Sequence, residues 1–492
     1  MSPGSPSSPA STSETRSARG AAPKRGALRR AYDWLDDRLG IGENILPVIQ
    51  HPVPRNVNWW YVFGSATLVA FIFQVITGVA LAFTYVPAPN SAYQTLQFIT
   101  HQALLGKVVR GIHYFGASAM VILIALHAAR VFLMGSYKYP RELSWLTGSL
   151  LLLLTLGMAF TGQLLRWDQD AYWAVVVAAE QAGRVPFVGP ILVQIVVAGQ
   201  TVGGATLTRF YATHVFLIPA AMFVLIGIHL YLVVRHGISE PPVAGQPVDR
   251  KTYQQRYREL IAHGIPFWPD AAWKDVVFAL AVGAVVVLLA IVVGAPELNK
   301  QADPTEIQAN PRPDWYFLWY FALLSLLPAG LENVVIIGAP LLAGLILLAL
   351  PLIAPTGERS PARRPWAVVA VVIPAVAIAV LVREGVESPW SPRLPPPHFP
   401  AEFRAQYSGS AAAGLALFET ESCSSCHAIA GTGGRKGPDL TTVGARLSRE
   451  QLTTRILNGG GGMPAYGNTL TPDETASLVA FLSAQTGGPP RR

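Results

Sequence analysis

The stretch that decides the fold is residues 110–133, which read RGIHYFGASAMVILIALHAARVFL. It is almost entirely apolar and long enough to cross the ~30 Å hydrocarbon core of a membrane as a helix. His113 and His127 lie fourteen residues apart within it. At about 100° per residue, fourteen residues return to within roughly 40° of the same helix face after a rise of about 21 Å. The stretch therefore predicts a membrane-spanning helix with two imidazoles on one face, one near each membrane surface.

A second apolar stretch, residues 211–234, repeats this arrangement with His214 and His229, fifteen residues apart. Ionisable residues inside membrane helices are costly and usually functional. Two such helices facing each other would bring the four imidazoles together as two pairs stacked across the bilayer. Imidazole pairs suit haem iron, and the absence of carboxylates or thiols nearby disfavours a hydrolytic zinc site. A single histidine could instead be a hydrogen-bonded packing residue, but four with matched spacing argue against that alternative.

The composition places these stretches in a membrane protein. The chain has 492 residues, of which 51% are hydrophobic and only 13% charged, whereas a soluble domain carries about 25% charge. The net charge of +8 belongs mostly to residues that flank apolar runs, which argues against nucleic acid as a partner. We expect an all-α fold: a polytopic membrane helix bundle followed by a small α-helical domain. Seven spans are predicted, approximately at residues 60–86, 111–134, 146–165, 211–234, 276–293, 331–353 and 366–382.

Glycines and arginines accompany the histidines. The first and third spans each carry two glycines at the fourteen-residue interval, namely Gly64, Gly78, Gly148 and Gly162. A glycine opposite each haem would let the flat macrocycle approach the backbone. Three arginines lie at the ends of the histidine spans and could pair with haem propionates, namely Arg110, Arg130 and Arg209. The alternative for each arginine is a side chain that extends to the membrane interface.

The distribution of Lys and Arg predicts the orientation. With a cytoplasmic N-terminus, the tail and the connections on its side hold 19 Lys and Arg, and the opposite connections hold seven. Positive residues concentrate on the cytoplasmic side. Seven spans then place the C-terminal domain outside the cytoplasm. We expect a multi-pass protein of a bacterial cell membrane.

The two cysteines of the chain lie together in the C-terminal domain, in Cys423-Ser-Ser-Cys426-His427. Two cysteines on one motif exclude a disulfide scaffold, an iron–sulfur site and a four-cysteine zinc site on this chain alone. C-x-x-C-H is the motif for covalent attachment of a c-type haem. Met463 lies 36 residues beyond His427, between Gly462 and Pro464. The surrounding sequence resembles a small class I cytochrome c, and the resemblance implies His427 and Met463 as iron ligands. Met463 could instead be a core methionine.

Residues 31 to about 390 resemble the cytochrome b of quinol:cytochrome c oxidoreductases, the bc and bf complexes. The stretches that carry the resemblance include RGIHYFGASAMVILIALHAARVFL, KYPRELSWLTG, LLRWDQDAYWA, LTRFYATHVFLIPA, FWPDAAWKD and ADPTEIQANPRPDWYF. The fifteen-residue interval is similar to the bf-like or Gram-positive branch, in which a four-helix protein and a three-helix subunit are separate chains. The domains expected here are a disordered basic tail (1–30), a four-helix haem-binding domain (31–245), a three-helix domain (246–387), a Pro-rich linker (388–409) and a cytochrome c domain (410–486).

The resemblance implies roles for individual residues. His113 and His214 would ligate a low-potential haem b near the outer side, and His127 with His229 a high-potential haem b near the cytoplasm. A cysteine that holds a further haem in the bf branch is replaced here by Val62, which puts a third haem in the membrane in doubt.

Two quinone sites are predicted. At the outer site, Pro313-Asp314-Trp315-Tyr316 matches the family motif PEWY, with Asp in place of Glu. Asp314 or Tyr316 could accept a proton from quinol. The alternative is an aromatic interfacial anchor with an incidental Asp. Arg235 and His236 are weaker candidates for a second, inner quinone site.

The implied function is oxidation of quinol, with menaquinol favoured by the Asp, and transfer of electrons to cytochrome c with electron bifurcation and proton translocation. The expected cofactors are two non-covalent haem b and one covalent haem c. The expected partners are a separate Rieske iron–sulfur protein, a soluble or membrane cytochrome c or terminal oxidase, the quinone pool and a second copy in a homodimer. Two other interpretations stay open: a cytochrome b that anchors a different respiratory dehydrogenase, and a haem-bearing transporter or sensor without enzymatic activity.

Overall fold

The computed structural model describes residues 26–199, 201–304, 311–387, 398–434, 437–459, 463–467 and 469–487. Most of the predicted tail (1–25), residues 388–397 of the predicted linker and Gly462 lie outside these ranges. Within these ranges, seven helices are long and apolar enough to cross a membrane, which confirms the predicted number. The chain divides into two units, Met1–His51 and Pro52–Arg492.

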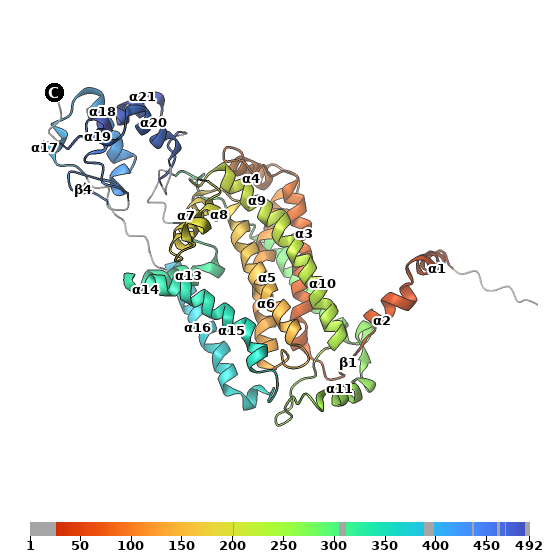
Figure 1. Ribbon diagram of the computed structural model, residues 1–492. Helices are drawn as coiled ribbons and strands as arrows, with labels where there is room; N and C mark the ends of the chain where they lie inside the picture. The colour runs from red at the N-terminus through yellow and green to blue at the C-terminus, as the bar shows by residue number, and fades with distance from the viewer. Residues whose placement is uncertain are drawn as a thin grey trace, which may run out of the picture. The chain divides into compact units, whose positions relative to one another are not determined.

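Four membrane-length helices carry the predicted histidines and glycines. They are α3 (Phe63–Ala82), α5 (Gly106–Leu133), α6 (Glu142–Leu164) and the continuous helix formed by α9 (Gly204–Ala212), a π-helical turn (Thr213–Leu217) and α10 (Ile218–His236). The helix α5 packs against both α3 and α6, and α6 packs along α10 (Figure 1). Ala66 and Ala70 are buried in the core of this bundle, and their small side chains allow α3 to approach α5 closely.

The π-helical turn brings the fifteen-residue histidine interval into register. In this turn the Ile218 N–H donates to the Thr213 carbonyl, one residue further back than in an α-helix. Pro219 follows directly; it lacks an N–H, and its ring would clash with the carbonyl of residue 215 in a regular helix. The wider turn absorbs one extra residue between His214 and His229. Their fifteen-residue interval is therefore equivalent to the fourteen residues between His113 and His127.

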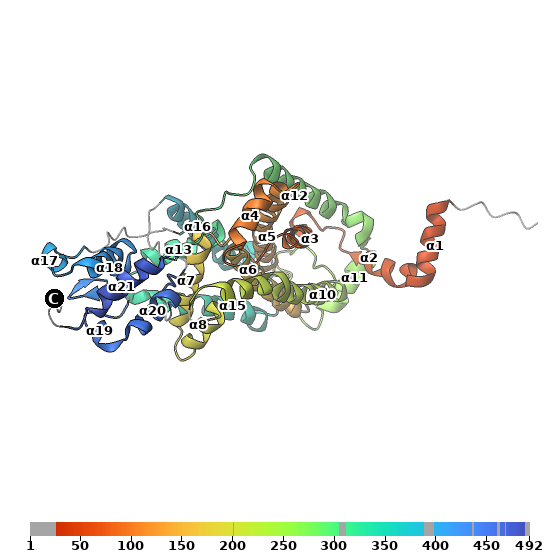
Figure 2. The same ribbon diagram turned by 90° about the horizontal axis from the view of Figure 1, so that it is seen from above.

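The remaining spans come from the C-terminal half of the membrane part. They are α12 (Trp273–Val292), the helix Gly330–Ile353, which includes a second π-helical turn (Val334–Gly338) and α15 (Ala339–Ile353), and α16 (Pro365–Glu387). Figure 2 shows α12 beside α3 and α5, with which it packs. The helix α13 (Trp315–Leu326) is too short to span, as its sequence predicts, and it packs on α16.

Short elements connect the spans. They are α4 (Ala92–His101), α7 (Gln169–Gly183), α8 (Gly189–Val197) and α11 (Tyr253–Ala262). The strand β1 (Pro52–Val53), before the first span, pairs with β2 (Ile265–Pro266), and α14 (Ala329–Asn333) forms the start of the span Gly330–Ile353. In the first unit, α1 (Ala27–Leu39) begins within the last residues of the predicted tail and is followed by α2 (Leu46–Ile49).

The C-terminal domain is a small helical fold with its own core. Its elements are α17 (Ala401–Arg404), α18 (Gly409–Thr420), β3 (Ala428–Ile429), β4 (Thr432–Gly433), α19 (Val443–Arg446), α20 (Arg449–Asn458) and α21 (Pro472–Ser483). Phe418 and Phe481 are fully buried where α18 packs on α21. A Cβ on Gly414 would lie 2.0 Å from the Ser477 carbonyl oxygen, so this close packing requires glycine. Phe399, which lies upstream of the predicted domain start at residue 410, is also buried in this core.

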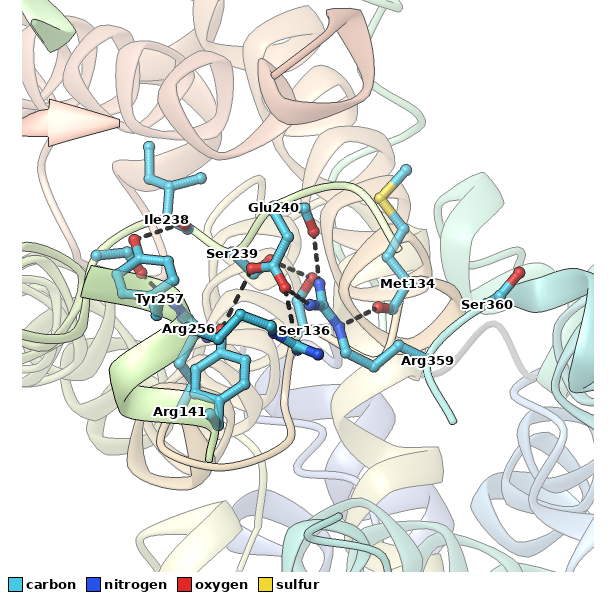
Figure 3. A network of polar contacts seen from close by, with 12 residues as sticks. Met134, Ser136, Arg141, Ile238, Ser239, Glu240, Arg256, Tyr257, Arg359 and Ser360 are labelled. Atoms are coloured by element: carbon cyan, nitrogen blue, oxygen red, sulfur yellow. Dashed lines mark hydrogen bonds and ion pairs between the residues drawn. The ribbon is translucent and has the colours of Figure 1, made fainter. Parts of the chain in front are cut away.

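A polar network joins the two halves of the membrane part near the C-terminal end of α10 (Figure 3). Arg359, which follows α15, is 3% exposed and forms an ion pair of 2.7 Å with Glu240, which follows α10. The same guanidinium donates to the carbonyl oxygens of Glu240 (2.6 Å) and Met134 (3.3 Å). Arg141 at the start of α6 donates to the His236 and Gly237 carbonyls. The segments after α5, α10 and α15 are thereby held together.

We predict that Glu240→Gln will lower the free energy of unfolding by on the order of 2 kcal/mol. A hydrogen bond to a charged group contributes roughly 1.5–3 kcal/mol, and the variant leaves the buried Arg359 without its counter-ion. Denaturant titration of the purified protein in mixed micelles measures the loss. The matched control is Arg256→Gln, because Arg256 lies 3.7 Å from the same carboxylate but is 40% exposed. An exposed pair contributes about 0–1 kcal/mol. Equal losses in the two variants would contradict the importance of the buried pair.

Candidate functional site

The four histidines form two facing pairs. In each pair, one histidine comes from α5 and the other from the continuous helix that ends with α10. The ring centroids of His113 and His214 are 6.3 Å apart, and those of His127 and His229 are 6.5 Å apart. A metal–imidazole bond is about 2 Å long, so two such bonds in line plus the two half-rings span about 6–6.5 Å. Each pair therefore has the separation that a single iron ion between two imidazoles requires.

Each predicted glycine lies against one of these imidazoles. A Cβ built on Gly162 would lie 2.6 Å from Cε1 of His214, and one on Gly64 would lie 3.0 Å from Cε1 of His127. Gly78 and Gly148 face His113 and His229, each with a Cβ distance of 3.3 Å. A side chain at any of these positions would displace the ring or the neighbouring helix. The glycines thus keep the space beside each imidazole free.

Threonine hydroxyls orient three of the four imidazoles. The Nδ1 of His113 lies 2.9 Å from Thr77 Oγ1, and the Nδ1 of His229 lies 2.9 Å from Thr147 Oγ1. The Nδ1 of His214 lies 3.1 Å from Thr161 Oγ1. Each hydroxyl donates its own hydrogen to a carbonyl four residues earlier in its helix. The hydroxyl oxygen must therefore accept the Nδ1–H of the imidazole. This tautomer leaves the Nε2 lone pair free to bind a metal.

The three predicted arginines differ in their surroundings. Arg110 is buried and already donates to Thr100 Oγ1 (3.2 Å) and the Pro296 carbonyl (2.7 Å). Arg209 is exposed and donates to two carbonyls of α8. Arg130 is buried with its Cζ 3.6 Å from the centre of the Tyr61 ring. Its Nε and Nη2 have no hydrogen-bond partner among the described residues. Of the three, Arg130 best fits an anionic group such as a propionate.

The predicted quinol-site residues Asp314 and Tyr316 lie together at the start of α13. The Tyr316 hydroxyl donates to Asp314 Oδ2 at 2.8 Å. The backbone N–H of Asp314 donates to Gln163 Oε1 at 3.0 Å, and Arg166 Nη1 lies 3.6 Å from Asp314 Oδ1. The carboxylate can accept a proton, and it is held from both sides by residues of α13 and of the end of α6.

The residues suggested for the inner quinone site lie at the C-terminal end of α10. Arg235 is exposed, and the His236 carbonyl accepts a hydrogen bond from Arg141. At the same end of the bundle core, Ser65 on α3 donates to the Asp275 carboxylate at the start of α12. This carboxylate was not among the sequence-predicted site residues.

The C-terminal domain presents Cys423, Cys426 and His427 on one turn. Burial raises the pKa of the Cys423 thiol to about 12. His427 Nδ1 donates to the Pro438 carbonyl at 2.8 Å, which leaves Nε2 free as in the membrane histidines. A Cβ on Gly437 would lie 2.5 Å from His427 Cε1, so this ring is also flanked by a glycine. Met463 is partly buried and packs against the domain core. These donors fit a covalently held haem with axial histidine and thioether ligands.

Comparison with known proteins assigns both parts of the chain. The family described as "Cytochrome b/b6/petB" matches residues 48–237, and "Cytochrome b(C-terminal)/b6/petD" matches residues 301–394. Cytochrome b6 of Heliobacterium modesticaldum is 41% identical over 211 residues, which are 42% of this chain and 99% of that protein. This chain belongs to the cytochrome b/b6 family. Residues 409–482 of this cytochrome b match "Cytochrome C oxidase, cbb3-type, subunit III", so a cytochrome c domain is fused to its C-terminal end.

Two further relatives extend over more of this cytochrome b. Cytochrome b of Rhodobacter capsulatus is 33% identical over 309 residues, which are 62% of this chain and 69% of that protein. A solved structure titled "Hyperthermophilic respiratory Complex III" has a TM-score of 0.62 and 30% sequence identity, and the match covers 72% of this chain and 91% of that one. The two families imply haem b and haem c as cofactors.

Several residues of the site were missed by the sequence analysis, and only some of them have a local signal. Threonine precedes glycine at Thr77-Gly78, Thr147-Gly148 and Thr161-Gly162, so the dipeptide itself could have identified the hydrogen-bond acceptors. Gln163 and Arg166 have no such signal, because their contacts with Asp314 join segments about 150 residues apart.

We predict that Gly162→Ala will lower the haem b content of the purified protein, because the new methyl group would displace His214. Gly157→Ala on the same helix is the matched control, since its Cβ would meet only Ile218 Cδ1 at 3.6 Å. Alanine favours a helix over glycine by about 1 kcal/mol, so neither change weakens α6 itself. The pyridine haemochrome spectrum per polypeptide measures the content. Full haem b content in the Gly162 variant would contradict the close contact.

Proposed function

We propose that this cytochrome b is the haem-carrying, quinol-oxidising subunit of a quinol:cytochrome c oxidoreductase in a bacterial cell membrane. The observation that supports this most strongly is the two imidazole pairs, each with a separation that suits one iron. The membership of the cytochrome b/b6 family and the similarity to a respiratory Complex III agree with it.

The ligand assignments form part of the proposal. His113 with His214 and His127 with His229 would hold two haem b, with Arg130 beside the second. Cys423 and Cys426 would hold one haem c covalently, with His427 and Met463 as its axial ligands. Haem iron supplies reversible one-electron transfer when it is bound. The threonine contacts of His113, His214 and His229 leave Nε2 as the ring nitrogen that would bind iron, and the glycines leave room beside each ring.

At the quinol site the chain supplies a proton acceptor rather than a redox group. Asp314 takes the proton of a quinol hydroxyl, and its hydrogen bond from Tyr316 orients the accepting carboxylate. Oxidation on the outer side, menaquinol as substrate, electron bifurcation, proton translocation, the Rieske partner and the homodimer follow from the family resemblance and belong to the same proposal.

The haem assignment predicts a reciprocal pair of results. Replacing Cys423 and Cys426 by Ala should abolish the haem-stained polypeptide in a denaturing gel, because no other cysteine is present to hold haem covalently. His229→Leu should leave that stain intact and remove haem b signal from the visible spectrum. A stain that survives the cysteine changes, or full haem b content in His229→Leu, would overturn the respective assignment.

The function itself is tested by quinol-dependent reduction of cytochrome c by the purified complex with its Rieske protein. Asp314→Asn should slow this reaction by about 10²-fold or more, since positioned general bases contribute roughly 10²–10⁴-fold. The haem spectra should be unchanged. Asp314→Glu should keep much of the activity because the charge persists.

Glu332→Gln serves as the control for this variant. Glu332 pairs with Arg184 at 2.8 Å, away from Asp314, and its neutralisation should leave the rate unchanged. An unmodified complex that cannot oxidise quinol would refute the proposed function. An Asp314→Asn variant with the unmodified rate would show that the proton leaves by another route.

A further inference from the structure

Arg166 lies between two carboxylates just beyond the end of α6. Its Nη1 is 3.6 Å from Asp314 Oδ1, and its Nε is 3.6 Å from Asp168 Oδ2. The Arg166 side chain is 20% exposed, that of Asp314 14% and that of Asp168 only 1%. The mostly buried guanidinium of Arg166 therefore lies equally far from the carboxylates of Asp168 and Asp314.

The two acids are held in different ways. Asp168 is the N-cap of α7 and accepts the backbone N–H of Ala171 at 2.9 Å. It also accepts the backbone N–H of Asn299 at 3.3 Å, so its charge is stabilised without Arg166. The Asp314 carboxylate accepts only the Tyr316 hydroxyl among the hydrogen bonds found in the described ranges. Asp168 therefore stays paired with Arg166, whereas Asp314 can leave its ion pair with Arg166.

A second observation, an unpaired buried donor on Gln163, points to a ligand site next to Asp314. Gln163 is 5% exposed, and its Oε1 accepts the backbone N–H of Asp314. Its Nε2 is buried and has no hydrogen-bond partner within the described part of the chain. A buried donor of this kind normally has a partner, so it is available to an oxygen of a bound molecule next to Asp314.

The charged and titratable groups around Asp314 come from three elements. They are Arg166, Asp168 and Asp170 from the stretch that links α6 to α7 and begins α7, Tyr114 from α5 with Arg110 behind it, and Tyr316 from α13. Burial alone would lower the pKa of the Arg166 guanidinium, but the charges of Asp168 and Asp314 outweigh it and raise that pKa. Arg166 therefore stays a cation throughout the accessible pH range.

We propose that Arg166 is a positioning residue for the quinol reaction, which keeps Asp314 ionised and in place until it accepts the quinol proton. This inference rests on the proposed function and adds a residue to it. In the proton step the O–H bond of a quinol hydroxyl breaks and an O–H bond forms on a carboxylate oxygen of Asp314; no electron moves in that step. Once Asp314 is neutral, Asp168 remains as the counter-ion of Arg166. The protonated Asp314 then no longer forms an ion pair with Arg166.

The pH dependence of quinol oxidation tests this role. Ionised Asp314 is required, so the rate falls on the acid side as the carboxyl group becomes protonated. The positive charge of Arg166, 3.6 Å from the carboxylate, favours its ionised form, so Arg166→Gln should move the acid limb of the rate profile to higher pH. Opposite charges within about 4–6 Å shift a pKa by roughly 1–3 units, so the acid limb should move up by about one pH unit or more. Arg166→Lys keeps the charge and should return the limb towards its original position.

Asp168→Asn provides a change of opposite sign. It removes the competing anion, leaves Arg166 to pair with Asp314 alone and should move the acid limb to lower pH. Asparagine is as good an N-cap as aspartate, so α7 keeps its first turn. This variant decides the question if Arg166→Gln fails to assemble. Arg184→Gln is the control, because Arg184 pairs with Glu332 and should leave the profile unchanged.

The assay uses the complete complex with a short-chain naphthoquinol and cytochrome c between about pH 4 and 9, a range that begins near the ordinary pKa of an aspartic acid, about 3.9. Haem spectra verify assembly. Opposite displacements of the acid limb in the Arg166 and Asp168 variants would support the proposal. Unchanged limbs, or displacements in the same direction, would show that Arg166 is only a structural counter-ion. An unmodified complex without quinol oxidation would instead count against the proposed function.

Discussion

A histidine inside a membrane bundle must satisfy one ring nitrogen and leave the other free if it is to bind iron. Water is absent there, so an unpaired N–H costs several kcal/mol. The Thr-Gly dipeptides of α3 and α6 solve both parts of this problem at three of the four positions. Threonine accepts the Nδ1–H, and the next residue, glycine, leaves room for the ring. This requirement sets the pairing of α3 with α5 and of α6 with α10, because each dipeptide must lie level with its histidine.

The sequence predicts the bundle well because its signals are periodic and local. The fourteen-residue intervals predict which helix faces carry His113, His127 and the four glycines, and the structure brings each glycine against an imidazole. The fifteen-residue interval on α10 shows where periodicity fails. A regular helix would leave His214 and His229 about 60° apart, and the π-helical turn before Pro219 removes the discrepancy. The proline was visible in the sequence, but the response of the backbone to it was not.

Contacts between distant segments could not be predicted in this way. Hydrophobic periodicity indicates which face of a helix is buried but not which loop reaches it. Glu240 and Arg359 lie 119 residues apart and meet only because α10 and α15 end on the same side of the bundle. Phe399 lies in a Pro-rich stretch whose composition predicts a linker, yet its ring is buried in the C-terminal core. In each case the chain topology decides the partner.

The acid of the PDWY motif, Asp314, is shorter than the Glu of the family motif. Aspartate reaches about 1.5 Å less far than glutamate, one C–C bond, and it has one rotatable bond fewer. A short acid can serve as proton acceptor only if the backbone brings it to the substrate and its charge is maintained there. The hydrogen bond from the Asp314 N–H to Gln163 fixes the backbone, and the hydrogen bond from the Tyr316 hydroxyl orients the carboxylate. The positive charge of Arg166 stabilises the negative charge of that carboxylate. Gln163 and Arg166 lie at and just beyond the end of α6, and Gly162, which precedes Gln163, lies against the imidazole of His214. The proton acceptor is therefore positioned by the same helix end that holds the nearest histidine pair, which couples the geometry of the two sites through a single rigid element.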